Sequence, residues 1–414
     1  MPPSVVELAA GVEPMVSIAQ ELVSHPRMQQ RHIRIGESSF PYLFGSNCLD
    51  AIGETLDKLD ADRFVVVTDN HVFGLHGQTL LRALGTETPV TVLGHEPGES
   101  MKTLSCLGEH IEKALRDGAT RRSVVVSFGG GVPGNLAGLM ASLLFRGVRL
   151  VHIPTTTVSA MDSVLSLKQA INSPVGKNHV GSYYTPTAVL TDVELFTTLS
   201  ARELRSGLCE MTKNCLAIKP AIISELQEIL ATANLAAPES LLWLLDASIS
   251  AKGQVTKNDT YERKDGLVLE YGHTVGHAIE LLDHRQRDAD GLSHGESIAL
   301  GMLIAARISF ARGWLTDTDV SIHDDLVTSL GVRTTIPDGV TPDRIIDTIR
   351  DDNKRGYLPL ADNAAAFVLL EQLGRPARSG GLPLVPVTFD EVYDALEAFE
   401  AAGADMATLG VEGR

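Results

Sequence analysis

The chain has 414 residues, 44% hydrophobic and 21% charged, which is the composition of a globular protein large enough for two domains. Its net charge of −17 argues against nucleic acid or an anionic membrane surface as a partner, since both are negatively charged. We find no signal peptide and no apolar run of about 18 residues that would span a membrane. The cysteines form no CxxC pair, which favours buried thiols in a reducing cytoplasm.

The first half of the chain predicts strands and helices in alternation. Short β-branched runs predict buried strands at 63–68, 90–93, 123–128 and 150–153. Helical spacing predicts helices at 104–118 and 136–145. Such alternation indicates a parallel sheet, so we expect a Rossmann-like α/β domain over residues 29–192.

The pattern changes after residue 192, where apolar residues recur at helical spacing. Helices are predicted at 195–233, 240–255, 272–282, 297–312 and 389–399. We therefore expect a mainly helical second domain over residues 193–400. Residues 1–28 and 401–414 are expected to be flexible segments at the two ends.

A glycine-rich segment, GGGVPG at 129–134, satisfies G-x-G-x-x-G between a predicted strand and a predicted helix. Glycines there let the backbone approach a pyrophosphate at a helix N-terminus. The acidic residue that the fingerprint places about 20 residues later is missing. Asp69, at the end of an earlier strand, is a substitute that can bind a ribose hydroxyl. The pattern favours dinucleotide binding, although a glycine turn used only for tight packing would look the same.

Metal-ligating side chains gather in the second half. His273 and His277 lie four residues apart and so share one helical face, His294 follows in LSHGES, and Glu210 lies upstream in LCEMTKN. Nitrogen and carboxylate donors from separate elements suit an open divalent-metal site with three protein ligands. A histidine pair at this spacing also occurs as a simple solvated pair.

Lysines and small polar residues suggest an anionic substrate. In the segment DSVLSLKQAINSPVGKN at 162–178, Lys168, Lys177 and Asn178 are able to converge on a phosphate. Further lysines lie elsewhere in the chain, at Lys213, Lys252 and Lys354.

Six of these motifs together resemble those of one enzyme family. GGGVPGNLAG, RGVRLVHIPTTT, DSVLSLKQAINSPVGKN, GLCEMTKN, EYGHTVGHAIE and LSHGESIALGM are similar, in this order, to the motifs of the dehydroquinate synthase-like sugar phosphate cyclases. The resemblance covers about residues 60–360. It implies an N-terminal NAD-binding α/β domain, a C-terminal mainly helical domain for metal and substrate, and an active site between them in a homodimer.

The resemblance also implies roles for individual residues. The metal, zinc or cobalt, would be held by Glu210, His273 and His294. Catalysis would involve Lys168, Glu270, His277 and Asp162. The NAD contacts would come from Asp69, Asn70, Glu99, Lys102, Gly130, Gly131, Asn135, Thr155, Thr156 and Lys177. The substrate would be bound by Lys168, Asn178, Lys213, Lys252, Lys354 and an Arg146 lent by the partner subunit.

Two positions depart from the family pattern. Dehydroquinate synthases carry arginine and asparagine where this chain has Gly266 and Glu270, and that arginine holds the substrate carboxylate. Losing a bidentate cation and gaining an anion would repel a carboxylate, so we expect a substrate without one. The segments LSLKQAIN, GKN and LEYGHTVGHAIE resemble the branch that converts glucose 6-phosphate to a carbocycle, at the start of 2-deoxystreptamine aminoglycoside biosynthesis. The branch that uses sedoheptulose 7-phosphate and dehydroquinate synthase itself are the alternatives.

The reaction implied by the resemblance is a phosphate-eliminating carbon–oxygen lyase reaction. A ring hydroxyl is transiently oxidised by NAD, phosphate leaves, the hydride returns, and an intramolecular aldol step closes the ring. A metal-dependent alcohol dehydrogenase is the alternative from another enzyme class, and it would release NADH stoichiometrically. A regulatory nucleotide-binding module is a third reading, against which the clustered metal donors and lysines argue.

Overall fold

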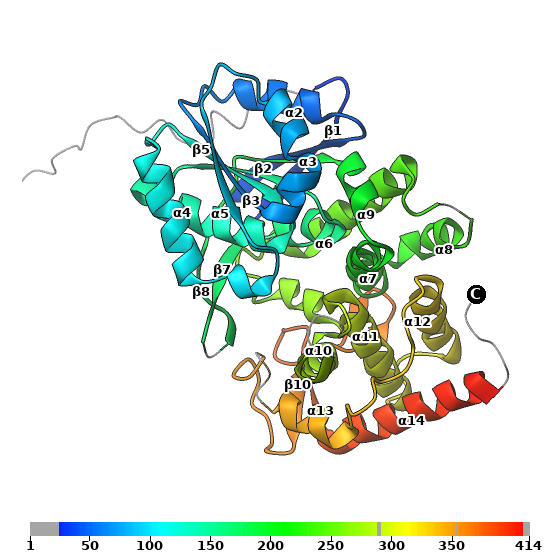
Figure 1. Ribbon diagram of the computed structural model, residues 1–414. Coiled ribbons are helices and arrows are strands. Elements are labelled where there is room, and N and C mark those ends of the chain that lie inside the picture. Colours follow the sequence, from blue (N-terminus) through cyan, green and yellow to red (C-terminus); the bar gives the residue numbers. More distant parts are fainter. Residues whose placement is uncertain are drawn as a thin grey trace, which may run out of the picture.

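The computed structural model describes residues 25–408 except 175, 233, 288–290, 351 and 353. A sheet with flanking helices forms one half of the molecule, and a bundle of helices forms the other (Figure 1). Most of the predicted flexible segments, residues 1–24 and 409–414, lie outside the described residues. Among those described, no helix has the length and apolar character that crossing a membrane requires.

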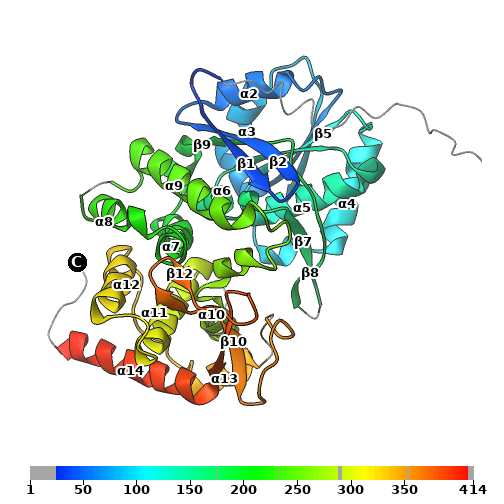
Figure 2. The ribbon, with the colours of Figure 1, turned by 180° about the vertical axis from the view of Figure 1, so that it is seen from behind.

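The sheet has seven strands in the order β1-β2-β9-β6-β5-β3-β4. All neighbouring pairs are parallel except the β1–β2 hairpin at one edge (Figure 2). The strands are β1 Gln29–Ile35, β2 Ser38–Gly45, β3 Phe64–Asp69, β4 Val90–His95, β5 Val124–Gly129, β6 Arg149–Pro154 and β9 Ala188–Asp192. The four predicted strands are β3 to β6, which confirms the parallel α/β sheet.

Alternating residues of the central strands bury opposite faces of this sheet. Val65 and Val67 of β3 belong to a core shared with α4 and α5, whereas Phe64 and Val66 belong to the larger core on the other face. The helices that follow the strands are α2 Leu49–Asp57, α3 Asn70–Ala83, α4 Leu104–Arg116 and α5 Gly131–Leu143. Helices α4 and α5 correspond to the two predicted helices of this half.

A separate antiparallel hairpin, β7 Lys168–Ser173 and β8 Gly176–Tyr183, extends from the sheet half towards the helical half (Figure 1). Asn135 of α5 anchors it, since its side-chain oxygen accepts a hydrogen bond of 2.8 Å from the backbone N–H of Ala170. The hairpin therefore carries Lys168 and Asn178 to the border between the two halves.

The helical half follows the last strand of the sheet, so a domain division at residue 192 stays a prediction that agrees with the element order. Its helices are α7 Ala201–Ala217, α8 Ile223–Thr232, α9 Pro238–Thr256, α10 His273–Arg287, α11 His294–Ala311, α12 Asp317–Ser329, α13 Pro342–Ile349 and α14 Phe389–Thr408. Four short strands complete it: β10 Ala364–Phe367, β11 Leu370–Gln372, β12 Arg375–Pro376 and β13 Val385–Thr388. The short helix α6 Thr157–Met161 comes earlier in the chain, between β6 and β7.

One prediction for this half is wrong. The single helix expected at 195–233 is broken, because Ser200 forms a capping box with Glu203 that starts α7, and Pro220 opens a new turn after α7 ends. Helix α14 extends through residue 408, and the flexible tail expected at 401–414 stays a prediction.

The helices that carry the predicted metal ligands touch through their backbones. A methyl group on Gly301 of α11 would collide with the carbonyl oxygen of Gly272, just before α10, where φ is +79°. A methyl group on Gly295 of α11 would collide with the carbonyl oxygen of Ser206 of α7. Helices α7, α10 and α11 are thus in close contact where their functional side chains begin.

Candidate active site

Three helices bring the predicted metal ligands together. Glu210 lies in the middle of α7, and His273 and His294 are the first residues of α10 and α11. The Oε1 atom of Glu210 lies 3.5 Å from Nε2 of His294 and 3.9 Å from Nε2 of His273. His277, one turn along α10, joins them: one nitrogen from each of the three imidazoles lies within 4.8 Å of the others. The sequence reasoning placed His277 near the substrate, and its position allows either role.

Hydrogen bonds behind two of the rings define their tautomers. Nδ1 of His273 donates to the carbonyl oxygen of Tyr271 at 3.2 Å, and Nδ1 of His294 donates to a carboxylate oxygen of Glu280 at 3.0 Å. Since these oxygens only accept, each Nδ1 carries a proton, which leaves Nε2 of both rings directed towards Glu210. A carboxylate behind a metal-binding histidine is the usual outer-shell arrangement.

The donor set fits a divalent cation. Glu210 is 1% exposed, and its Oε1 has no hydrogen-bond partner among the described residues. Its other oxygen pairs with Lys213 of the same helix. A buried carboxylate oxygen that faces two imidazole nitrogens, at 3.5 and 3.9 Å, is a donor set that suits a divalent metal ion.

The charges of this cluster are strongly coupled. Burial lowers the pKa of His273 to about 4, so this imidazole is neutral at neutral pH. Burial also acts on His294, but the carboxylates of Glu210 and Glu280 outweigh it and raise the pKa of His294 to about 10. A cation that binds at His294 would therefore displace one proton.

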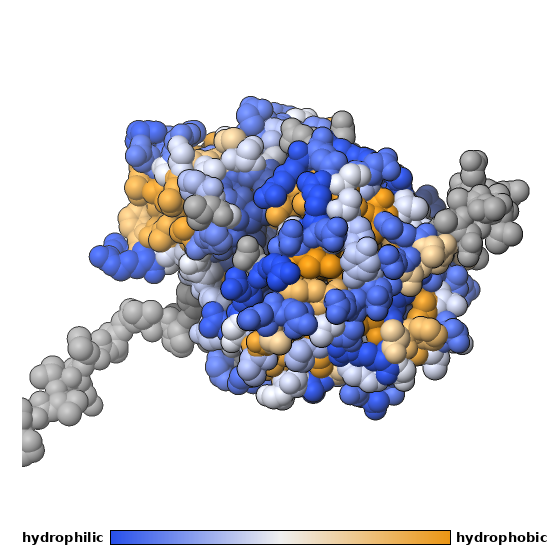
Figure 3. Space-filling view, turned by 90° about the horizontal axis from the view of Figure 1, so that it is seen from below, coloured by the Kyte–Doolittle hydropathy of each residue, from blue (hydrophilic) through white to orange (hydrophobic). Residues whose placement is uncertain are grey.

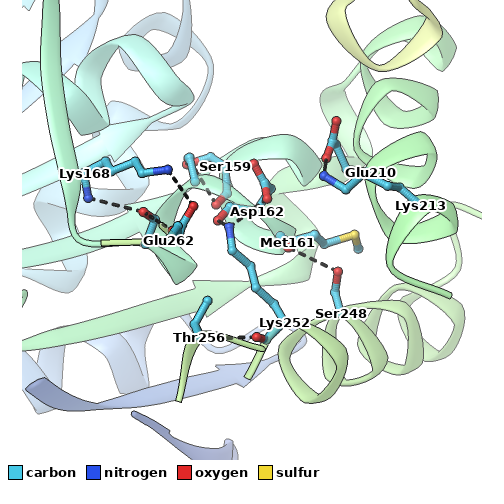
Figure 4. A network of polar contacts seen from close by, with 12 residues as sticks. Ser159, Met161, Asp162, Lys168, Glu210, Lys213, Ser248, Lys252, Thr256 and Glu262 are labelled. Atoms are coloured by element: carbon cyan, nitrogen blue, oxygen red, sulfur yellow. Dashed lines mark hydrogen bonds and ion pairs between the residues drawn. The ribbon is translucent and has the colours of Figure 1, made fainter. Parts of the chain in front are cut away.

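A cavity of about 570 Å³ opens beside His273, between the β7–β8 hairpin and helices α7 and α9. Three of its lysines are paired with acids, as Figure 4 shows. Lys168 lies 2.6 Å from Glu262 and Lys252 lies 2.8 Å from Asp162, while Lys213 pairs with Glu210. The ammonium groups are thus held in place in a cavity of suitable size for a sugar phosphate.

Glu270 lines the same cavity and is ionised. Its Oε2 lies 3.4 Å from Nζ of Lys354, which is itself 2.9 Å from Asp352. Burial alone would raise the pKa of Glu270, but the positive charge of Lys354 and further electrostatic contributions from His273, His277 and Lys168 hold it below its ordinary value. The cavity therefore presents a carboxylate at this position.

A second cavity of about 220 Å³ lies at the carboxyl ends of β3, β5 and β6 and the start of α5. Asp69, Gly130, Gly131, Thr155 and Thr156 line it. Nothing lies within 4 Å of where a side chain of Gly131 would begin, so the first turn of α5 is open to a ligand. Open backbone N–H groups at a helix N-terminus suit a pyrophosphate, so these residues fit a dinucleotide.

Most of the predicted site residues lie in the larger cavity, in the smaller cavity or in the cluster of Glu210 and the histidines. The larger cavity is lined by Lys102, Asn135, Asp162, Lys168, Asn178, Lys213, Lys252, Glu270 and His273. Five others line neither cavity: Asn70 donates to Glu96, Glu99 accepts from Asn172, Lys177 pairs with Glu280, Lys354 pairs with Glu270 and Asp352, and Arg146 is exposed just after α5. Asn135 was predicted as a cofactor residue, but its carbonyl side faces the hairpin and the larger cavity.

Sequence reasoning missed Glu262, Arg263 and Glu280. Glu262 and Arg263 line the larger cavity from a charged segment that resembles a solvated loop. Glu280 was detectable, because it lies three residues after His277 and seven after His273 on one face of a predicted helix.

Left-handed backbone occurs at several of these positions. Asn178 has φ +59° and Glu262 has φ +51°, and both line the larger cavity. Arg146 has φ +72°. Such conformations are costly for residues other than glycine and cluster at functional sites.

Known proteins are similar to this chain over most of its length. Models of the 3-dehydroquinate synthase N-terminal and C-terminal regions match residues 92–206 and 207–355. A 2-deoxy-scyllo-inosose synthase of Streptoalloteichus tenebrarius is 45% identical over 388 residues, which is 92% of this chain and 99% of that protein.

Solved structures show the same likeness. A crystal structure of 2-deoxy-scyllo-inosose synthase complexed with carbaglucose-6-phosphate, NAD+ and Co2+ is 35% identical with a TM-score of 0.82, over 89% of this chain and 100% of that one. A 2-epi-5-epi-valiolone synthase from Streptomyces hygroscopicus, with NAD+ and Zn2+ bound, has a TM-score of 0.75 at 24% identity, over 90% and 99% of the chains, and shows the shared fold. The chain therefore belongs to the dehydroquinate synthase-like family of sugar phosphate cyclases, among relatives that are 2-deoxy-scyllo-inosose synthases.

Proposed function

We propose that the protein converts glucose 6-phosphate into 2-deoxy-scyllo-inosose and inorganic phosphate, with NAD and one divalent cation, zinc or cobalt, as cofactors. The observation that carries this proposal is the ionised Glu270 in a lysine-lined cavity beside the Glu210–His273–His294 cluster. The named relatives and the bound analogue in a related structure support it. The product would enter 2-deoxystreptamine aminoglycoside biosynthesis.

The bound cofactors would supply a reversible hydride acceptor and a Lewis acid, which together make the carbon next to an oxidised ring position acidic. The residues of the chain bind, orient and move protons. Lys168 is 46% exposed on the cavity side of its pair with Glu262, so its ammonium is able to contact the substrate phosphate. Asp162, fixed by Lys252, accepts hydrogen bonds from ring hydroxyls.

Glu270 and His277 are proposed for the later proton transfers. The ionised carboxylate of Glu270 accepts a proton or a hydroxyl hydrogen bond, depending on the step. Burial lowers the pKa of His277 to about 3, so its imidazole is neutral and has a free lone pair for a hydroxyl proton. Hydrogen bonding to substrate hydroxyls alone is the simpler role for both.

The choice of substrate follows from the loop before α10. The backbone N–H of Gly266 donates to Asp259 at 2.9 Å, and the N–H groups of Arg263 and Lys264 donate to the same carboxylate. This folded loop offers no arginine at position 266, and Glu270 would repel a substrate carboxylate. A sugar phosphate without a carboxylate, such as glucose 6-phosphate, avoids this repulsion.

The protein is further proposed to act in the cytoplasm as a homodimer in which Arg146 reaches the neighbouring site. Support comes from the exposed position of Arg146 and from the exposed apolar side chain of Leu143 (54%) beside it. The cysteines Cys48, Cys106, Cys209 and Cys215 are all free and buried, as a reducing compartment allows. Seen from below, the surface shows several clusters of apolar residues among hydrophilic ones (Figure 3).

One assay tests the reaction. The purified protein is incubated with NAD, Co²⁺ and either glucose 6-phosphate or sedoheptulose 7-phosphate, and phosphate, carbocycle and absorbance at the NADH maximum are followed. We expect phosphate and carbocycle from glucose 6-phosphate with no net NADH. Stoichiometric NADH without phosphate would indicate an alcohol dehydrogenase, and a preference for sedoheptulose 7-phosphate would indicate a valiolone synthase.

A further inference from the structure

A buried series of hydrogen bonds leads from helix α12 to the cluster of Glu210, His273 and His294. His273, one of the proposed ligands, donates from Nδ1 to the carbonyl oxygen of Tyr271 at 3.2 Å. The side chain of Tyr271 is fully buried in the helical half, away from the cavity. There its hydroxyl lies 2.9 Å from Nε2 of His323 on α12.

The backbone carbonyl oxygen at the far end of this series of hydrogen bonds determines which group donates in the bond between Tyr271 and His323. Nδ1 of His323 lies 2.7 Å from the backbone carbonyl oxygen of Asp319, which can only accept, so Nδ1 carries the proton. Nε2 of His323 is then an acceptor, and the hydroxyl of Tyr271 donates to it. Burial lowers the pKa of His323 to about 4, which agrees with a neutral ring.

A polar pair at this place needs an explanation, because both side chains are fully buried. His323 and Tyr271 are each 0% exposed, and their rings meet edge to face with centroids 6.0 Å apart. Phenylalanine and leucine would fill such positions without buried polar atoms that must be satisfied. A directional hydrogen bond adds what apolar packing lacks, namely one defined orientation of the tyrosine side chain.

The orientation of Tyr271 matters because of its neighbours in the chain. Glu270 before it faces the cavity, and Gly272 after it adopts a left-handed conformation in contact with Gly301 of α11. The side chain of Tyr271 is therefore fixed by its hydrogen bond to α12, and the next residue, Gly272, is fixed by its contact with α11. The carbonyl group of Tyr271 lies between these two fixed points. Its direction sets the tilt of the His273 ring.

We propose that His323 is a positioning residue that acts through Tyr271 to orient the metal-binding imidazole of His273. This inference rests on the metal site of the proposed function. His323 lines neither the cavity nor the cluster, and its hydrogen bond with the tyrosine is the polar link that leads from it to the site. Partners behind a ligand typically affect metal affinity by about 10–100-fold, and we expect about tenfold here because the contact is one residue further away.

The test measures the affinity for Co²⁺ and the visible absorption spectrum of the Co²⁺ protein. Tyr271→Phe leaves Nε2 of His323 unpaired, and His323→Leu leaves the tyrosine hydroxyl unpaired. Each is expected to weaken Co²⁺ binding about tenfold and to alter the spectrum. The double variant Tyr271→Phe/His323→Leu should be no weaker than the worse single variant, because both changes break the same link. His323→Gln, whose amide oxygen can replace Nε2 as acceptor, should restore most of the affinity.

Tyr42→Phe is the matched control. It also deletes one fully buried hydroxyl, which donates to the carbonyl oxygen of Ala160 at 2.9 Å in the sheet half. It should lower thermal stability without changing Co²⁺ affinity. Wild-type Co²⁺ affinity and spectrum in Tyr271→Phe and His323→Leu would overturn the inference, as would additive losses in the double variant. A wild-type protein that binds no Co²⁺ would instead refute the proposed metal site itself.

Discussion

Glu280 offers a direct test of how the metal cluster is held. Its carboxylate accepts from Nδ1 of His294 at 3.0 Å and also lies 3.2 Å from Lys177. Lys177 is 58% exposed, so that pair contributes only about 0–1 kcal/mol. The bond to His294 is part-buried and charge-assisted, worth about 1.5–3 kcal/mol. Glu280→Ala should therefore weaken metal binding by about 10–100-fold, and Glu280→Gln, which keeps an acceptor oxygen, by about tenfold.

The assay is competition for Co²⁺ between the metal-free protein and a chromogenic chelator. Glu391→Gln is the control, because Glu391 also accepts from a cation, Arg312 at 2.7 Å, but does so on α14, outside the cluster. We expect the control to keep wild-type affinity. Affinity within twofold of wild type in both Glu280 variants would show that His294 needs no carboxylate behind it and would refute the reasoning.

The remaining predictions concern ligands, substrate and pH. His273→Ala and His294→Ala should fold but lose metal and turnover; full occupancy by elemental analysis in either variant would exclude the ligand assignment. Lys168→Ala should keep NAD bound and lose most activity, because its ammonium faces the larger cavity; near-normal turnover at saturating substrate would contradict this. Since Glu270 is ionised, kcat/KM for glucose 6-phosphate should exceed that for the seven-carbon keto-acid phosphate of dehydroquinate synthase by roughly 10⁴-fold; comparable values would contradict the role of Glu270. Burial lowers the pKa of His152 from 6.5 to about 4, so the folded state binds fewer protons and stability is lost as the pH falls from about 6.5 towards 4. Urea unfolding of the wild type should lose about 2 kcal/mol more between pH 7 and pH 5 than that of His152→Gln, and equal losses would show that His152 does not titrate.

Local patterns predicted the elements that are buried on both sides. Strands β3, β5 and β6 are mainly apolar runs because a core covers each face of the sheet, whereas the edge strand β4 alternates in burial. Strand β1 was missed because QQRHIRI at 29–35 exposes alternate polar residues at the edge of the sheet. The broken helix at 195–233 was missed because helical spacing continues on both sides of Pro220, and the cap at Ser200 was overlooked.

Site residues that belong to sequence motifs could be predicted. Ion pairs between residues far apart in the sequence could not, because they depend on the fold. The proposed ligands Glu210, His273 and His294 were predicted from their motifs, and the structure places the three side chains side by side. The partner of Lys168, by contrast, is Glu262, which is 94 residues away along the chain. No local sequence pattern predicts such an ion pair, because it forms only when the β7–β8 hairpin and the loop before α10 come together in the fold.

The glycine contacts between α7, α10 and α11 separate two properties of the site. Side chains such as that of His294 determine the chemistry of the cluster. The spacing of its donor atoms is determined by Gly295 and Gly301, because these residues lack side chains and let the helices approach closely. Exchanging one ligand for another would alter which metal is preferred while the frame stays the same. Adding a methyl group at either glycine would move a whole helix and so displace donors that are themselves unchanged. The geometry of this centre is thus encoded at positions that a comparison of ligands alone would overlook.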